Sequence, residues 1–224
     1  MSTQAGSIGK PWRQAALAFA AVALLFVSVA DVEGVIIGKR KKEPMPRPVI
    51  QDPSPDGLNL TDLEDVVSFD LDAAHGAEFV TWTKQSLETG FFWLDLDSDG
   101  VVDDGSELFG NATQASQGLP RDGFAALSQY DQTELGGDRD GTLSRQDQIW
   151  PALRFWVDWN HDGQASADEL STMADLHIAA IDVVGQPLNL ADANGNYVLS
   201  YALAHGDEGE DDFWVFDVLF QRAH

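Results

Sequence analysis

The segment from residue 158 to residue 169 carries oxygen-bearing side chains at the spacing that a calcium ion requires. It reads Asp-Trp-Asn-His-Asp-Gly, then five residues and a glutamate, which is the calcium-loop pattern of EF-hands. Ca²⁺ binds six to eight oxygens, supplied from loop positions 1, 3, 5, 7, 9 and 12. Position 7 acts through its backbone carbonyl, position 9 often through water, and the glutamate with both oxygens. We therefore expect a calcium site made by Asp158, Asn160, Asp162, Gln164, Ser166 and Glu169.

Two other acidic segments repeat parts of this pattern. One has aspartates at positions 1, 3 and 5 and a glycine at position 6, but an extra residue precedes its glutamate, which a bulge at Gly105 could absorb. The other lacks the first aspartate, and Asp131, displaced by an insertion, is the candidate replacement. It also ends in the shorter Asp147, which favours a weaker site. The candidate ligands are Asp95, Asp97, Asp99, Val101, Asp103 and Glu107 in the first segment, and Asp131, Asp138, Asp140, Thr142 and Asp147 in the second.

Two more segments, Asp52–Gly57 and Asp70–Gly76, carry degenerate versions of the loop. Each has acidic residues before a glycine but lacks several of the ligand positions. Aspartate and glycine are also the residues that form turns between strands. For these two segments an acidic turn is at least as good an interpretation as a metal site.

The stretches between the loops predict short elements. Phe124–Tyr130 has apolar residues at spacing three and predicts a short helix, and Gln146–Val157 predicts another, shortened or kinked at Pro151. Apolar and β-branched runs bounded by turn residues predict strands. The fold class we expect is α+β, with short strands and short helices organised around EF-hand-like calcium loops. The expected strands are Val66–Phe69, Phe79–Trp82, Phe91–Leu94, Ile178–Val183, Tyr197–Tyr201 and Phe213–Phe220.

The composition restricts the possible partners. The chain has 224 residues, 37 acidic against 13 basic, and a formal net charge of −24. Such an excess repels nucleic-acid phosphates, so we expect no nucleic-acid binding, and Ca²⁺ is the expected cofactor. Because a compact domain with this charge repels itself, we expect folding to depend on bound metal. The absence of cysteine excludes disulfides and thiolate metal sites.

The N-terminus predicts export. Two basic residues precede an apolar run from Ala15 to Val29, which ends in small residues, and this pattern predicts a signal peptide over residues 1–30. An uncleaved anchor is the alternative, although the run is shorter than the roughly 20 residues that a spanning helix needs. Residues 31–47 are basic and proline-rich, which predicts a flexible tether, and residues 48–224 form the predicted calcium-binding domain. We expect a secreted or periplasmic protein that contacts membrane only through an uncleaved N-terminus.

Several strings, in order, resemble the calcium-binding module of bacterial RTX-type exported proteins, and are similar to the self-processing module of iron-regulated RTX proteins. They are Phe69–Asp72, Trp93–Gly100, Asp103–Asn111, Gly123–Leu127, Leu153–Gly163 and Glu169-Leu170. The resemblance implies calcium-dependent folding and, in some members, autocatalytic cleavage of an Asp-Pro bond upstream of the first loop. Here Arg47-Pro48 stands at that place. Arginine has no carboxylate to attack its own peptide carbonyl, so we expect no cleavage there.

The residues favour a binding module over an enzyme. The five histidines are scattered, and the acidic residues stand at loop-ligand spacing, which calcium explains better than a glycosidase carboxylate pair does. We therefore expect no catalytic residues, and a partner that is an unidentified protein or cell surface. Two alternatives remain open. Gly141 and Gly163, 22 residues apart, suit a dockerin-like interaction module, and the family resemblance suits an autocatalytic Asp-Pro module.

Overall fold

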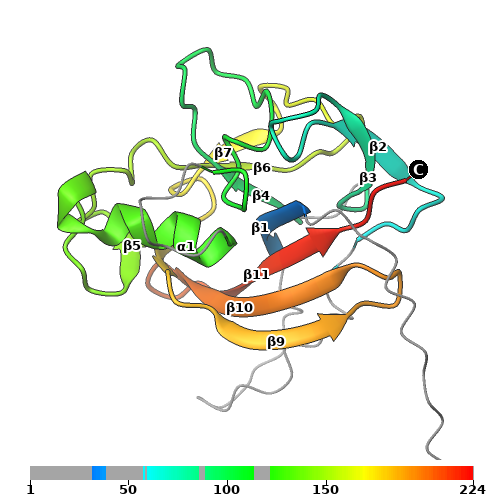
Figure 1. The fold of residues 1–224 in the computed structure, drawn as a ribbon. Coiled ribbons are helices and arrows are strands. Elements are labelled where there is room, and N and C mark those ends of the chain that lie inside the picture. Colours follow the sequence, from blue (N-terminus) through cyan, green and yellow to red (C-terminus); the bar gives the residue numbers. More distant parts are fainter. Residues whose placement is uncertain (1–31, 39–57, 59, 86–88, 114–121, 224) are drawn as a thin grey trace, which may run out of the picture.

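The computed structural model describes residues 32–38, 58, 60–85, 89–113 and 122–223, drawn in colour in Figure 1. The predicted signal peptide, most of the predicted tether and the degenerate segment Asp52–Gly57 lie outside these residues. Within the described residues, no helix is long and apolar enough to cross a membrane.

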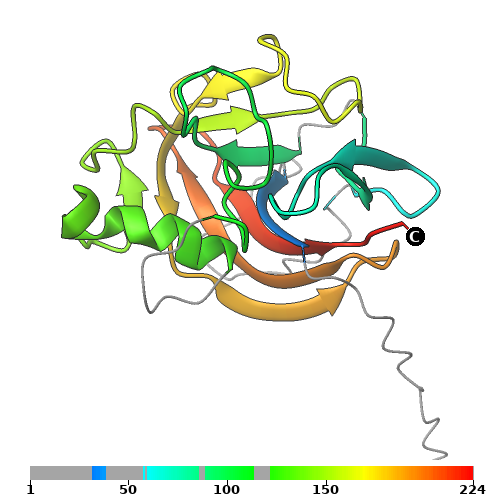
Figure 2. The same ribbon diagram turned by 45° about the horizontal axis from the view of Figure 1, so that its top comes forward.

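Antiparallel strands make up most of the regular secondary structure in the described residues (Figures 1 and 2). Nine strands form one sheet in the order β5-β8-β10-β11-β1-β4-β6-β7, with β9 paired to β10, while β2 and β3 form a separate hairpin. The strands are β1 (Val32–Gly38), β2 (Val66–Phe69), β3 (Glu78–Thr81), β4 (Gly90–Trp93), β5 (Thr142–Ser144), β6 (Arg154–Trp156), β7 (Leu170–Thr172), β8 (Ile178–Asp182), β9 (Gln186–Ala191), β10 (Tyr197–Gly206) and β11 (Phe213–Phe220).

The sheet separates two apolar cores, because successive residues of its central strands point to opposite faces and both faces are buried. Phe92 and Phe155 belong to one core, which also contains Phe124 of helix α1 (Gly123–Ser128). Phe91 and Trp156 belong to the other, which the β2–β3 hairpin covers. Helix and hairpin accordingly lie on opposite sides of the molecule in both views (Figures 1 and 2).

The expected α+β class is wrong, because the described fold is mostly β. Its single α-helix has six residues and continues into the 3-10 turns Gln129–Asp131 and Thr133–Leu135. The helix predicted over Gln146–Val157 does not form. Instead Arg154–Trp156 is strand β6, paired with β4 on one side and β7 on the other. The apolar spacing suited a helix, but pairing in the sheet buries Phe155 and Trp156 in different cores, which one helix face cannot do.

Each of the six predicted strands coincides with or overlaps a strand of the structure. Val66–Phe69 and Phe213–Phe220 have the predicted bounds, and four others overlap the strands formed at Glu78–Thr81, Gly90–Trp93, Ile178–Asp182 and Tyr197–Gly206. Strand β1 was not predicted, since residues 31–47 were expected to be a tether. It pairs along its length with β11, from Val32 opposite Phe220 to Gly38 opposite Trp214. Residues 32–38, within the predicted tether, are therefore a strand of the main sheet.

Candidate metal centres

Loop 158–169 begins with side chains that accept hydrogen bonds from the loop's own backbone. Asp158, 1% exposed, accepts at Oδ1 from the N–H of Asp162 (3.1 Å) and at Oδ2 from that of Gly163 (2.9 Å). Asn160 Oδ1 accepts from the N–H of Asp162 (3.0 Å), and Asp162 Oδ1 accepts from that of Gln164 (2.8 Å). These bonds curl the backbone of the loop around the side chains of positions 1, 3 and 5.

Glu169 closes the same loop from its far end. It is 3% exposed, and its Oε1 and Oε2 accept from the N–H groups of Trp159 and Ser166, each at 3.0 Å. Strands β6 and β7 flank the loop and pair antiparallel, with Trp156 opposite Leu170. This pairing brings the first and last ligand positions together although ten residues lie between them in the sequence.

Loop 95–107 repeats these bonds at matching atoms. Asp95 Oδ2 accepts from the N–H of Gly100 (3.0 Å), as Asp158 Oδ2 does from Gly163. Glu107 Oε1 and Oε2 accept from position 2, Leu96 (2.9 Å), and position 9, Asp103 (3.0 Å). Positions 3 and 5 behave likewise, since Asp97 and Asp99 accept from the N–H groups of Asp99 and Val101.

The extra residue in loop 95–107 is accommodated at Gly105. Its N–H donates to the backbone carbonyl of Asp70 at 2.8 Å. A Cβ at this position would lie 1.8 Å from the carbonyl oxygen of Leu71, so only glycine allows the two backbones to approach this closely. The loop therefore bulges toward residues 70–71 and still returns Glu107 to its place.

Loop 131–147 has the same arrangement, with Asp131 in the place of the missing first aspartate. Asp131 Oδ2 accepts from the N–H of Gly141 at 3.1 Å, and Asp147 Oδ2 accepts from that of Ser144 at 2.7 Å. Carboxylate oxygens of Asp131, Asp138 and Asp147 lie within 4.8 Å of one another. Asp140 and Thr142 occupy positions 5 and 7, and the Thr142 N–H donates to Asp140 Oδ1 (2.8 Å). Ser144 stands at position 9, and counting three residues on from Gly141 would have found it.

Backbone conformation confirms that the three loops share one geometry. In each, position 4 is a non-glycine residue in the left-handed region and position 6 is a glycine with positive φ. Left-handed backbone is uncommon outside glycine, so its recurrence at one position in three unlike sequences reflects a common loop. The residues at position 4 are Ser98 (φ 68), Arg139 (φ 62) and His161 (φ 61), and those at position 6 are Gly100 (φ 81), Gly141 (φ 93) and Gly163 (φ 71).

The donor set of these loops fits a hard divalent cation. Asp131 and Asp147 are only 4% and 2% exposed, yet the Oδ1 atom of each has no hydrogen-bond partner among the described residues. A buried carboxylate oxygen without a donor is costly, and a bound cation would satisfy it. Burial raises the pKa of Asp147, and it also raises the pKa of Glu107 and Asp158. Oxygen-only ligands of this kind suit calcium better than zinc.

In the degenerate segment Asp70–Gly76 an arginine side chain pairs with an acidic residue. An alanine stands where the position-5 oxygen belongs, and an arginine from the chain's C-terminal end supplies positive charge. Arg222 Nη2 lies 2.6 Å from Asp72 Oδ2, and its Nη1 lies 2.8 Å from Glu78 Oε2. Partial burial acts against ionisation, but hydrogen bonds from His75 and Arg222 hold the pKa of Asp72 well below its usual range. A guanidinium already neutralises this segment.

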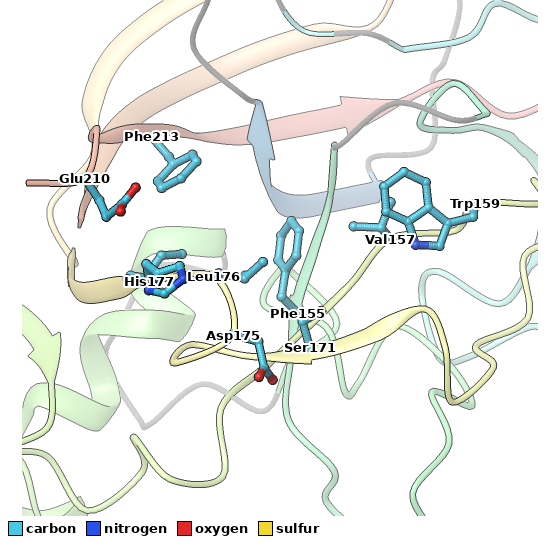
Figure 3. A pocket seen from close by; sticks show the side chains of 10 residues that line it. Phe155, Val157, Trp159, Ser171, Asp175, Leu176, His177, Glu210 and Phe213 are labelled. Atoms are coloured by element: carbon cyan, nitrogen blue, oxygen red, sulfur yellow. The ribbon is translucent and has the colours of Figure 1, made fainter. Parts of the chain in front are cut away.

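A mainly apolar cavity of about 330 Å³ lies beside loop 158–169. Figure 3 shows Phe155 and Phe213 facing its interior and Trp159, which holds position 2 of the loop, at one end. Asp175 and Glu210 are the acidic residues of its lining.

Comparison with known proteins places this geometry in a family. The family model of the SPM domain matches residues 49–221. The chain belongs to the SPM domain family, the family of self-processing modules. The chain is also 35% identical over 112 residues to "Iron-regulated protein FrpA" of Neisseria meningitidis serogroup C. That alignment covers 50% of this chain and 10% of FrpA, so the chain matches about a tenth of its relative's length. The resemblance to the self-processing module of iron-regulated RTX proteins is thereby confirmed, while the calcium binding that it implies stays a prediction.

Proposed function

We propose that this SPM domain is an exported calcium-binding module whose three EF-hand-like loops each hold one Ca²⁺ and thereby complete the fold. The observation that carries the proposal is the repeated loop geometry, together with the unpartnered, buried Oδ1 atoms of Asp131 and Asp147. Each ion would be held by carboxylate, amide and backbone carbonyl oxygens of one loop. It would supply positive charge and no redox or acid chemistry.

The positions of the loops support a structural role for the ions. Loop 158–169 joins β6 to β7, and loop 95–107 follows β4, whose residues lie in both cores. Loop 131–147 runs from the end of the helical segment through β5. In a chain with a net charge of −24, gathering carboxylates at three places is unfavourable until a cation neutralises them. Calcium would therefore tie the peripheral turns to the central sheet.

Calorimetric titration of calcium into the chelator-treated protein tests this function. We expect saturable binding to three sites, and Glu169→Gln and Glu107→Gln should each remove one, because a glutamine offers only one oxygen. Glu210→Gln removes the same charge from an exposed position outside the loops and should retain all three sites. Absence of binding at several millimolar calcium would show that the proposal is wrong.

Family membership supports a second function, self-cleavage at an Asp-Pro bond. The bond that can serve is Asp52-Pro53, since the sequence contains no other Asp-Pro pair and Arg47-Pro48 lacks the attacking carboxylate. In such a step the Asp52 side chain would attack its own peptide carbonyl, and the bond to the Pro53 nitrogen would break. Both residues lie outside the described part of the chain. Incubation with calcium, followed by gel electrophoresis and mass spectrometry, would detect the fragment that begins at Pro53; Asp52→Ala is the control.

The predicted signal peptide supports export, and the relationship to FrpA agrees with it. Extracellular calcium modules commonly bind with dissociation constants of about 10⁻⁴–10⁻³ M, so the loops would fill after export. The partner we propose remains a protein or cell surface, recognised in a calcium-dependent way.

A further inference from the structure

A tryptophan from the β2–β3 hairpin contacts the first ligand of loop 158–169. The indole Nε1–H of Trp82 donates to Asp158 Oδ2 at 3.0 Å. Trp82 directly follows β3 and is completely buried in the aromatic cluster of the second core. Asp158 Oδ2 therefore accepts two hydrogen bonds, one from this indole and one from the Gly163 N–H. Among the described residues Asp158 Oδ1 accepts a single hydrogen bond, from the Asp162 N–H at 3.1 Å, so the indole and the Gly163 N–H orient the carboxylate while Oδ1 keeps a lone pair for a cation.

The other two loops lack this contact among the described residues. Asp95 accepts from the backbone N–H groups of residues 98–100, and Asp131 Oδ2 accepts from that of Gly141. No side-chain donor from a different element reaches either aspartate in the described part of the chain. Among the described residues, loop 158–169 is thus the loop whose position-1 carboxylate accepts a hydrogen bond from a side chain of the apolar core.

The residues next to Trp82 hold the same loop at two more points. The Thr83 carbonyl lies 3.0 Å from His161 Nδ1, at position 4, and Gln85 Nε2 donates to the Asn160 carbonyl at 3.3 Å. Residues 82–85 therefore contact positions 1, 3 and 4 of the loop. This segment connects the β2–β3 hairpin, which covers one core, to the half of the loop that carries the first ligands.

We propose that Trp82 is a positioning residue for calcium at loop 158–169, and that its indole N–H reports the occupancy of that loop. The inference rests on the proposed calcium binding. Outer partners that orient a metal ligand typically change metal affinity about 10–100-fold when they are removed. Loss of the indole should weaken binding at loop 158–169 by about that factor and leave the other two loops unchanged.

The chain offers a matched control for removing the indole. Trp156 is also fully buried, belongs to the same aromatic cluster, and has its ring centre 5.7 Å from that of Trp82. Its Nε1, unlike that of Trp82, has no hydrogen-bond partner in the part of the chain that the structure describes. Trp82→Phe and Trp156→Phe therefore remove similar volume from one core, but only the first removes a donor to Asp158.

Amide resonances can measure the loops one at a time, because the N–H of each position-6 glycine donates to its own position-1 aspartate. We propose calcium titrations of ¹⁵N-labelled protein followed at Gly100, Gly141 and Gly163. In Trp82→Phe the Gly163 midpoint should rise about 10–100-fold, with the other two midpoints unchanged. In Trp156→Phe all three midpoints should stay within about threefold of the wild type, since no ligand loses its orienting bond.

The inference would be overturned if the calcium midpoint of the Gly163 resonance rose equally in both variants. It would also be overturned if that midpoint did not change in Trp82→Phe. If Trp82→Phe does not fold, the wild-type indole resonance of Trp82 decides, because it must shift with the same midpoint as Gly163. An indole resonance that stays fixed while Gly163 titrates would contradict the positioning role. Failure of the proposed function looks different, since then none of the three glycines would respond to calcium in the wild type.

Discussion

Replacing Asp131 with asparagine should change stability in opposite directions with and without calcium. Asparagine has the shape of aspartate, and its carbonyl oxygen can still accept from the Gly141 N–H. Its amide group would then point where the unpartnered Oδ1 lies now, and an amide N–H₂ cannot bind a cation. The substitution therefore removes one ligand and one negative charge while it preserves the turn.

In excess calcium the variant should be less stable. An ion present at about 100 times its dissociation constant stabilises the folded state by roughly 2.7 kcal/mol, and loss of the site removes that contribution. For a chain of this size, 1 kcal/mol shifts the melting temperature by about 2–4 °C, so we expect a decrease of roughly 5–11 °C.

In chelator the variant should be more stable than the wild type. Oxygens of Asp131 and Asp147 lie within 4.8 Å of each other, and both side chains are buried. At an effective dielectric constant of about 20, two negative charges 4.8 Å apart repel by roughly 3.5 kcal/mol, and the raised pKa of Asp147 relieves part of this repulsion in the wild type. We expect the melting temperature to rise by several degrees.

Differential scanning calorimetry of the wild type and the variant, in chelator and in calcium, measures both effects. Asp122→Asn is the matched control, because it removes the same charge and asparagine also caps helices well at the N-terminal position that Asp122 holds on α1. It should show little change in either condition. A melting temperature for Asp131→Asn that moves in the same direction in chelator and in calcium would refute the assignment of Asp131 as a ligand.

Two further predictions concern the degenerate segment Asp70–Gly76 and the effect of pH on stability. Arg222→Ala leaves Asp72 without its guanidinium, so the free energy of unfolding should fall by about 1–3 kcal/mol with and without calcium, while the number of bound ions is unchanged, as calorimetry and titration would show. An unchanged free energy of unfolding would contradict the structural role of this ion pair. Burial raises the pKa of Glu107 and Asp158 above the unfolded values of 4.5 and 3.8. Stability from these groups is present at low pH and lost as pH rises through the raised pKa values, so the metal-free melting temperature should increase on acidification from neutrality toward pH 5 and the calcium-induced increment should shrink. A metal-free melting temperature that falls over this range would contradict that sign.

The candidate loops were predictable from the sequence because their ligands follow a fixed local spacing. That spacing identified positions in loops 95–107 and 158–169, and it suggested Asp131 despite the insertion before Asp138. The structure brings these residues together, while their binding of calcium stays a prediction. Arg222 and Trp82 could not be found in the same way. Each reaches its aspartate across a distance of many residues, and only the folded sheet makes them neighbours.

The fold class could not be obtained from local periodicity alone. Between Gln146 and Val157 the apolar spacing matches a helix, yet β6 needs only Arg154–Trp156 and gains partners on both sides. Strands of three residues leave almost no period to detect, which also explains why β5 and β7 were missed. By contrast, the eight-residue run Phe213–Phe220 was identified within its correct bounds. Short strands are specified by their neighbours in the sheet rather than by their own sequence.

The number of calcium ions bound to the folded chain tests the central claim most directly. Native mass spectrometry of the protein, first stripped with chelator and then returned to millimolar calcium, counts them without any reporter group. We predict three bound ions, one for each of the loops that end at Glu107, Asp147 and Glu169. A folded protein that carries no calcium under these conditions would contradict the claim.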